Sequence, residues 1–490
     1  MHPLQYYLAT LGDELLEFHG NASTLINGAV ADSRKVRPGF LFVAVPGVKT
    51  DGSLFAHSAV EAGANTVVAT KRVDLPEHAN LVLVKNAYVA AARIAEAAAG
   101  YPARSFKMIG VTGTNGKTTC TYLLRDILKR AGWRTGMIGT VQYEVGDERM
   151  MADRTTPMPF ALQDILKRMR AAGTEIAVAE TSSHALHQRR PGTARFSGAL
   201  FTNLTGDHCD YHITMENYFA AKQVLFTEYL RTRAPAVINI DDAYGRQLVD
   251  NLTELNHGQI ITFGTSQDAD WRIERWQAGL DGIRMDLAGP EAAPVRYAAP
   301  VVGGFNIYNV AGAAVLASYL GAAEEDIQYA VSHFRGAPGR MEAVEIGAGI
   351  TAFVDYAHTD DALANVLEAV RNLNPKRVLV LFGCGGDRDR TKRKRMGKVA
   401  GQLADKVYVT SDNPRGEDPV GIIEEIVAGI PAEADVLTFV DRREAIRQAI
   451  ADAEAGDVLL VAGKGHETYQ EIKGEKFPFD DREELRCAAK

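Results

Sequence analysis

The chain has 490 residues, which is too many for one hydrophobic core, and about 150 residues per domain predicts three domains. Hydrophobic residues make up 46% of the sequence and charged residues 24%, the composition of a globular protein. The net charge of −8 argues against a general nucleic-acid-binding protein, because contacts with phosphates require a basic surface.

The sequence carries no recognisable targeting signal. The first residues, Met-His-Pro-Leu-Gln, lack the basic and then apolar pattern of a secretion signal, and no apolar run is long enough to span a bilayer. We therefore expect a cytoplasmic protein without membrane insertion. The cysteines form no C-x-x-C pair, which predicts free thiols rather than disulfides or a thiolate zinc site. They are Cys120, Cys209, Cys384 and Cys487.

Residues 1–102 are predicted to form a first α/β domain. Short strand-like runs are separated by helical, alanine-rich stretches such as residues 87–99. Tyr101-Pro102 closes this unit. The strand-like runs are residues 40–45, 66–69 and 81–84.

Residues 103–334 are predicted to form a second domain with a mostly parallel sheet. Apolar runs alternate with helical patterns, which is typical of parallel strands joined by crossover helices. Residues 271–287 instead alternate apolar and polar side chains around Gly282, which predicts an antiparallel hairpin appended to the sheet. The apolar runs are residues 108–111, 176–179, 198–202 and 236–240.

Residues 110–119 read Gly-Val-Thr-Gly-Thr-Asn-Gly-Lys-Thr-Thr, between a predicted strand and a predicted helix. Glycines let backbone N–H groups turn toward an anion, and the following helix presents its positive N-terminus. Lys117 can supply an ammonium and Thr118 a magnesium-binding hydroxyl. We predict a site for a nucleoside triphosphate, although Val111 stands where the usual spacing has a glycine. The predicted loop is Gly113, Thr114, Asn115, Gly116, Lys117, Thr118 and Thr119.

Polar residues follow two further predicted strands of this sheet. Glu180 ends one of them, and His208 lies in the loop after the next. The ends of parallel strands share one edge of a sheet, so both side chains could reach a magnesium ion that bridges the phosphates. A zinc site of His208, Cys209 and His212 is the alternative, but it has no obvious fourth ligand.

Lys222 lies on the apolar face of a predicted helix at 215–230. A lysine at such a place either extends its ammonium to water or is buried. Burial lowers the pKa of a lysine, and a neutral amine near magnesium can react with carbon dioxide to form a carbamate, in effect a long carboxylate. The bare sequence leaves both readings open.

Residues 335–490 are predicted to form a third, Rossmann-like domain after a boundary near Arg335–Arg340. Several of its predicted strands end in polar and glycine residues, where ligands gather in open α/β sheets. Arg388 occupies the place of the third glycine of a dinucleotide-binding fingerprint, so NAD binding is not expected. Lysines of the basic run 388–395 are expected at a solvated helix start. The predicted strands are residues 351–355, 377–383, 406–410, 435–440 and 457–462.

Taken together, these motifs resemble those of the Mur ligase family of bacterial cell-wall synthesis, in order and along nearly the whole chain. Two departures are Asp360, where the family often has proline, and Cys209, where leucine is common. The matching residues are Gly113–Thr119, Glu180, Ser182–His184, Phe201–Leu204, Asp207-His208, Asp210–His212, Lys222, Gly304–Asn306, Gly339–Glu342 and Asp355–Thr359.

The resemblance implies an ATP-dependent synthesis of an amide bond. A substrate carboxylate attacks the γ-phosphoryl group to give an acyl phosphate, which an incoming amine displaces. The implied catalytic residues are Lys117, Glu180, His208 and Lys222. Magnesium would be held by Thr118, Glu180, His208 and carbamylated Lys222, and ATP by the loop together with Asn306, Arg340 and Asp355.

Within the family, Asp32-Ser33-Arg34 and Asp412-Asn-Pro-Arg415 are similar to those of members that add the third amino acid, meso-2,6-diaminopimelate, to UDP-N-acetylmuramoyl-L-alanyl-D-glutamate. The three domains would then bind UDP, ATP and the amino acid in that order, in a monomer. The positions matching the nucleotide-linked substrate site are Ser33, Val48, Lys49, Thr50, Thr155, Thr156, Ser182, Gln188 and Arg190. Those matching the diaminopimelate site are Arg388, Asp412, Asn413, Arg415, Gly463 and Glu467.

Three alternatives remain at this point. The same ligation could use L-lysine, but that branch usually lacks the arginine of the Asn-Pro-Arg sequence. Folylpolyglutamate synthetase shares the phosphate loop but is disfavoured by the first domain and the Asp-Asn-Pro-Arg sequence. A non-catalytic homologue is disfavoured by the intact Lys117, Glu180, His208 and Lys222.

Overall fold

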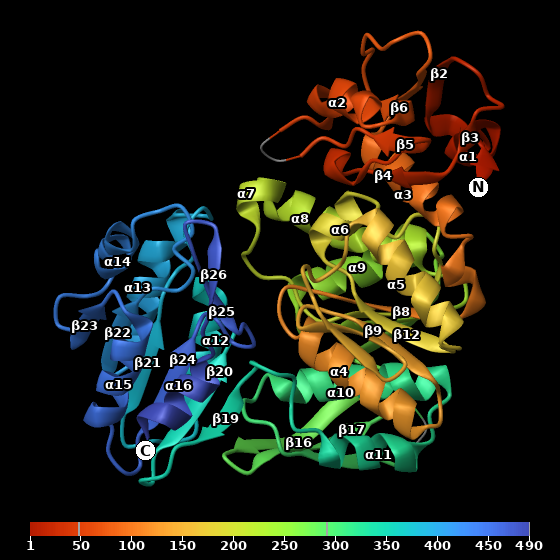
Figure 1. The fold of residues 1–490 in the computed structure, drawn as a ribbon. Helices are drawn as coiled ribbons and strands as arrows, with labels where there is room; N and C mark the ends of the chain where they lie inside the picture. Colours follow the sequence, from red (N-terminus) through yellow and green to blue (C-terminus); the bar gives the residue numbers. More distant parts are fainter. Residues whose placement is uncertain (48–49, 291–292, 490) are drawn as a thin grey trace.

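The computed structural model describes residues 1–47, 50–290 and 293–489, which fold into three α/β domains in chain order (Figure 1). The N-terminal domain, in red and orange, lies above the central domain, and the C-terminal domain, in blue, lies beside it. The predicted boundaries after residues 102 and 334 stay predictions. Within the described ranges, no helix combines the length and apolar character needed to cross a membrane.

The N-terminal domain is built on a five-stranded sheet of order β2-β7-β6-β5-β4. All its strands are parallel except β2, which pairs antiparallel with β7. The predicted strands and the alanine-rich helix are confirmed. The elements are β1 (His2–Pro3), α1 (Leu4–Leu11), β2 (Leu15–His19), β3 (Leu25–Ile26), β4 (Gly28–Val30), β5 (Phe40–Val43), α2 (Ala56–Glu61), β6 (Ala64–Ala69), β7 (Asn80–Val84) and α3 (Ala87–Ala98).

The central domain has an eleven-stranded sheet of order β11-β10-β9-β12-β8-β13-β14-β15-β16-β17-β18. Its middle strands are parallel and its two edges antiparallel. The elements are β8 (Lys107–Thr112), α4 (Lys117–Arg130), β9 (Thr135–Ile138), β10 (Gln142–Val145), β11 (Glu148–Met151), α5 (Pro159–Ala171), β12 (Ile176–Glu180), α6 (Ser183–His187), β13 (Phe196–Phe201), α7 (Cys209–His212), α8 (Met215–Val224), β14 (Pro235–Asn239), α9 (Ala243–Glu254), β15 (Gln259–Gly264), β16 (Trp271–Gly279), β17 (Gly282–Ala288), β18 (Val295–Ala299), α10 (Asn306–Leu320) and α11 (Glu324–His333).

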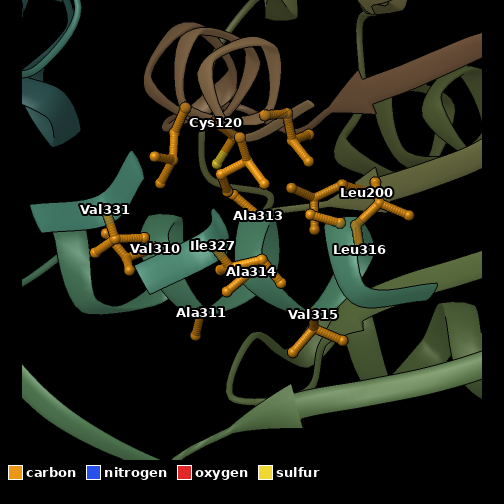
Figure 2. Close-up of a cluster of buried hydrophobic side chains, with 14 of the residues drawn as sticks. Cys120, Leu200, Val310, Ala311, Ala313, Ala314, Val315, Leu316, Ile327 and Val331 are labelled. Carbon is orange, nitrogen blue, oxygen red and sulfur yellow. The ribbon is translucent and has the colours of Figure 1, made fainter. Parts of the chain in front are cut away.

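The core of the central domain forms around α10, which packs against α4, α11, β13 and β14. Most of its side chains are apolar and buried, as expected for a helix that packs against several other elements. Figure 2 shows Cys120 of α4 facing Ala313 of α10, with Ile327 and Val331 of α11 nearby. This packing fixes the start of α10 next to the start of α4, where the predicted phosphate loop lies.

The C-terminal domain has a six-stranded sheet of order β19-β20-β24-β21-β22-β23. Only β19 is antiparallel, so the polar ends of the other strands share one edge. The elements are β19 (Glu342–Glu345), β20 (Thr351–Asp355), α12 (Asp360–Arg371), β21 (Val378–Phe382), α13 (Thr391–Leu403), β22 (Lys406–Thr410), α14 (Pro419–Val427), β23 (Val436–Phe439), α15 (Arg442–Asp452), β24 (Val458–Ala462), β25 (Tyr469–Ile472), β26 (Glu475–Pro478) and α16 (Asp481–Ala488).

Candidate active site

The predicted phosphate loop joins β8 to α4 and needs glycine at two positions. Gly113 has φ +149° and Gly116 has φ +83°, values that other residues rarely adopt. A Cβ on Gly113 would lie 1.9 Å from Thr202 Oγ1, and one on Gly116 would lie 2.2 Å from Asn309 Oδ1. The loop is therefore pressed between β13 and α10, with the N-terminus of α4 directed at any anion it holds.

Lys117 folds back over this loop. Its Nζ donates to Gly113 O at 3.0 Å and to Thr114 O at 2.7 Å. Burial lowers the pKa of Lys117, and the nearby Glu180 carboxylate opposes that effect. A bound phosphate would favour the charged ammonium in the same way.

Glu180 and Thr118 bring oxygen ligands together beside the loop. Glu180 is fully buried and accepts from Thr118 Oγ1 at 3.2 Å. Thr140 fixes the carboxylate by donating its N–H to Oε1 and its hydroxyl to Oε2, both at 2.8 Å. A carboxylate and a hydroxyl are the ligand types that Mg²⁺ prefers, so these two residues fit the predicted role.

His208 reaches the same region from the loop after β13. Its Nε2 lies 3.3 Å from Asp207 Oδ2, and its ring stands edge-on to His184 at 4.8 Å between centroids. His212 Nε2 instead bonds Ser183 Oγ at 3.0 Å, and the Cys209 side chain lies outside the described part of the structure. The described side chains therefore give the zinc alternative no support.

Lys222 is buried, which rejects the reading in which its ammonium extends to water. The residue is 1% exposed, and its Nζ donates to Gly113 O at 2.6 Å. The Nζ also lies 4.5 Å from the centroid of the Tyr218 ring. Burial, and secondarily the Lys117 ammonium, holds the pKa of Lys222 well below its usual value. Burial thus favours the neutral form of the amine that lies against the phosphate loop.

The C-terminal domain touches the phosphate loop directly. Arg340 Nη2 donates to Thr118 Oγ1 at 3.2 Å. Asp361 of α12 accepts from Asn115 Nδ2 at 3.0 Å and from Thr205 Oγ1 at 2.7 Å. Neither Thr205 nor Asp361 was expected in the site from the sequence.

The remaining residues predicted to bind the nucleotide lie around this contact. Asp355 is buried and accepts from the N–H groups of Met341 and Ala357, both at 2.7 Å, which fixes the turn that carries Arg340. Arg340 Nε is a buried donor without a partner in the described structure, as expected of a group that awaits an anionic ligand. Asn306 begins α10 and donates to Val302 O at 2.8 Å.

The residues predicted to bind the nucleotide-linked substrate form one network in the central domain. Thr156 Oγ1 donates to Glu180 O at 2.7 Å, and Ser182 N–H donates to Thr156 Oγ1 at 3.1 Å. Arg190 donates to Thr156 O at 2.5 Å and to Gln188 Oε1 at 3.0 Å. Burial, and then the neighbouring Arg154, lowers the pKa of Arg190 to about 10, which favours an anionic ligand there.

The other residues predicted for the nucleotide-linked substrate, Ser33, Val48, Lys49 and Thr50, belong to the N-terminal domain, which is predicted to bind UDP. Ser33 begins a short turn, Ser33–Lys35, that is capped by the Asp32 carboxylate. Thr50 is in the loop that precedes α2. Val48 and Lys49 lie outside the described residues.

A cavity of about 520 Å³ lies between the β10–β11 hairpin and the C-terminal domain. Thr155 lines it from the central domain and Glu467 from the C-terminal domain, so it joins the two predicted substrate groups. Sequence reasoning missed Thr140 and His466, which also line it. Thr140 follows a strand too short to be predicted, and the only signal for His466 was its place beside Glu467.

The predicted diaminopimelate residues gather at the shared strand edge of the C-terminal domain. Asn413 Nδ2 donates to Glu467 Oε2 at 2.8 Å. Gly463 packs so closely that a Cβ there would lie 2.7 Å from Asp412 Oδ2. Burial, and then the Asp412 charge, raises the pKa of Glu467, whereas Lys464 Nζ at 3.1 Å stabilises its carboxylate.

Two arginines lie on the other side of this group. Arg415 Nη1 donates to Gly386 O at 2.9 Å, and its Nε lies 3.2 Å from Glu471 Oε2. Arg388 is exposed and donates to Asp387 O at 3.0 Å. A Cβ on Gly385 would lie 2.8 Å from Arg415 Nη1 and 3.8 Å from Arg388 Cγ, so both side chains border the same loop.

The fold and this site define a multidomain nucleotide-binding enzyme. Family models match along the chain: "Mur ligase family, catalytic domain" over residues 25–103, "Mur ligase middle domain" over 111–317 and "Mur ligase, glutamate ligase domain" over 339–465. The chain belongs to the Mur ligase family.

Similar proteins include the UDP-N-acetylmuramoyl-L-alanyl-D-glutamate--2,6-diaminopimelate ligases of Synechococcus elongatus, with 45% identity over 99% of this chain and 98% of the relative, and of Aquifex aeolicus, with 41% identity over 94% and 93%. A solved structure of a ligase of that name has 32% identity, covers 99% of this chain and 98% of its own, and has a TM-score of 0.69. A Mycobacterium tuberculosis folylpolyglutamate synthase shares the fold, with 18% identity, 76% and 92% coverage and a TM-score of 0.60.

Proposed function

We propose that this protein is an ATP-dependent ligase that joins meso-2,6-diaminopimelate to the D-glutamyl residue of UDP-N-acetylmuramoyl-L-alanyl-D-glutamate. The observation that carries the proposal is the cavity between the two domains. Thr155, predicted to bind the nucleotide-linked substrate, and Glu467, predicted to bind diaminopimelate, both line it. The relatives from Synechococcus elongatus and Aquifex aeolicus, which match along nearly their whole length, are ligases named for the same substrates. Both the soluble nucleotide-linked substrate and ATP belong to the cytoplasm, where the step would serve peptidoglycan precursor synthesis.

The proposed reaction is the one that the resemblance to the Mur ligase family implies. The D-glutamyl γ-carboxylate attacks the γ-phosphoryl group of ATP, which forms an acyl phosphate and releases ADP. The substrate amine then attacks the acyl carbon, and phosphate leaves as the amide bond forms. Lys117, the loop N–H groups and Arg340 neutralise charge on the transferred group, and this is where such enzymes gain most of their rate.

Thr118, Glu180 and His208 would hold Mg²⁺, which supplies further positive charge to the phosphates. Lys222 is suited to carbamylation, because burial beside the loop lowers the pKa of its amine and favours the neutral form. Its Nζ would form a bond with the carbon of CO₂ and lose one proton, which leaves a negative carbamate. Residues 1–102 would bind UDP, 103–334 ATP and 335–490 the amino acid, and the monomeric state stays a prediction.

Phosphate release in the presence of the nucleotide-linked substrate, ATP and one amino acid tests the proposal. We expect turnover with meso-diaminopimelate and much slower turnover with L-lysine or L-ornithine. Diaminopimelate has a second carboxylate, and a site built for it keeps an unpaired cation when lysine binds, so a preference of roughly a thousandfold is expected. Equal rates with lysine would favour the lysine-adding alternative, and no release with any of the three would reject the function.

Arg415 is proposed as the cation that meets this second carboxylate. We expect Arg415→Ala to raise the KM for meso-diaminopimelate about tenfold or more and to change the KM for ATP little. The variant loses the paired hydrogen bonds between the guanidinium and the second carboxylate of the substrate. The advantage over lysine should narrow accordingly. Arg390→Ala is the matched control, since Arg390 is an exposed arginine of the same domain that pairs with Glu425. An unchanged preference in Arg415→Ala would assign the selectivity elsewhere.

A further inference from the structure

A fully buried ion pair, Arg442 with Asp481, lies beside the residues predicted to bind diaminopimelate. Arg442 begins α15 and Asp481 begins α16, and both side chains are 0% exposed. Arg442 Nε lies 2.7 Å from Asp481 Oδ1, and its Nη2 lies 2.8 Å from Oδ2. The planar fork of the guanidinium is thus held in one orientation by the carboxylate.

The same guanidinium contacts the ends of two strands. Arg442 Nη2 donates to Ala462 O at 2.9 Å, and its Nη1 reaches Ser411 O at 3.5 Å. Ala462 ends β24 and Ser411 follows β22, with β21 between them in the sheet. Asp412 directly follows Ser411, and Glu467 lies in the loop that follows Ala462. One side chain therefore ties together the bases of the two loops that carry the predicted acids.

The charges around Arg442 explain why the pair is needed. Burial disfavours the charged guanidinium, but Asp481, Asp412 and Glu467 together raise its pKa. Burial first, and then the Asp412 charge, raises the pKa of Glu467, so the two carboxylates disfavour each other, and both Lys464 and Arg442 supply positive charge near them. A buried ion pair adds little net stability compared with apolar residues, so stability alone does not account for Arg442 and Asp481.

We propose that Arg442, held by Asp481, is a positioning residue for the amino-acid substrate: it fixes the spacing of Asp412 and Glu467 so that both carboxylates meet the substrate ammonium. The proposal rests on the function proposed above. It assigns no contact between Arg442 and the substrate, because the guanidinium is enclosed by protein groups.

The same sheet offers a matched control. Arg377 precedes β21 and Asp457 precedes β24, so this pair lies at the opposite edge of the strands. Arg377 Nε lies 3.1 Å from Asp457 Oδ2, and the Asp457 side chain is 0% exposed. Asp481→Asn and Asp457→Asn therefore remove the same charge from equally buried carboxylates of one domain, although the partner Arg377 is 33% exposed and Arg442 is 0% exposed.

Steady-state kinetics of the full-length enzyme with meso-diaminopimelate, together with thermal unfolding, tests the proposal. We expect Asp481→Asn to raise the KM for the amino acid at least about tenfold, with kcat and the KM values for ATP and the nucleotide-linked substrate changed by less than about threefold. Asp457→Asn should lower Tm but leave all three KM values within about twofold. A rise in the amino-acid KM of equal size in Asp457→Asn would overturn the positioning role.

Arg442→Lys keeps the test decisive if Asp481→Asn does not fold. A lysine keeps the charge but can reach only one of the two carbonyl groups, so we expect a smaller rise in the same KM. An unchanged amino-acid KM in the folded variants refutes the positioning role alone. If the wild-type enzyme does not turn over, the proposed function fails, and calorimetric binding of meso-diaminopimelate to wild-type and variant enzyme still decides whether Arg442 orders an ammonium site.

Discussion

Lys117→Ala should lower kcat at least about a hundredfold, the usual loss when one electrostatic contact with the reacting group is removed. The Lys117 Nζ donates to the loop carbonyls of Gly113 and Thr114 and lies where the β- and γ-phosphates are predicted to bind. Gly113 and Gly116 keep the loop backbone in place, so the loss should fall on turnover more than on folding. Phosphate release at saturating substrates measures the effect.

Lys129→Ala is the control for this variant, because Lys129 is an exposed lysine of the same helix. It should retain wild-type turnover. Near-normal ligation by Lys117→Ala, with normal Tm, would mean that the triphosphate binds elsewhere.

Lys222→Ala should lower kcat by about a hundredfold to a thousandfold, with partial recovery on addition of formate or acetate. The alanine leaves room beside Gly113 O, and a short carboxylate can supply there the negative oxygens that a carbamate would supply. Carbamylation itself is measured by carbon NMR of the wild-type enzyme with labelled bicarbonate and substrates. The signal should be absent in Lys222→Ala.

Acetate should not restore Lys117→Ala, which separates a specific replacement from a general salt effect. An unmodified Lys222 ammonium in the presence of bicarbonate and substrates would disprove the carbamate. Full activity of Lys222→Ala without added carboxylate would show that this side chain has no catalytic role.

The elements that the sequence predicted well are those with long apolar runs. β12 and β14 are buried along their whole length, and their continuous runs are typical of central parallel strands. The antiparallel edge β9–β10–β11 was missed. Its strands have four residues each, and β11 reads Glu-Arg-Met-Met with mostly exposed side chains, so no period-2 pattern marks it.

The site divides in the same way. The phosphate loop is a local motif, and its glycines, lysine and threonine could be found from ten consecutive residues. Thr140, Asp361 and Arg442 act through contacts with residues distant in the chain, which no local pattern reveals. Lys222 is intermediate, because periodicity placed it on an apolar face while only tertiary packing decided between solvent and burial.

The hydrogen bonds of Asp361 with Asn115 and Thr205 have a consequence for communication within the molecule. The segment that would hold the nucleotide also holds α12 of another domain, so a change in the loop is felt there through a single amide side chain. The nucleotide loop and α12 are in direct contact, so no intervening residues are needed to couple them. A nucleotide bound at the loop would therefore lie one hydrogen bond away from the domain that carries the predicted amino-acid site.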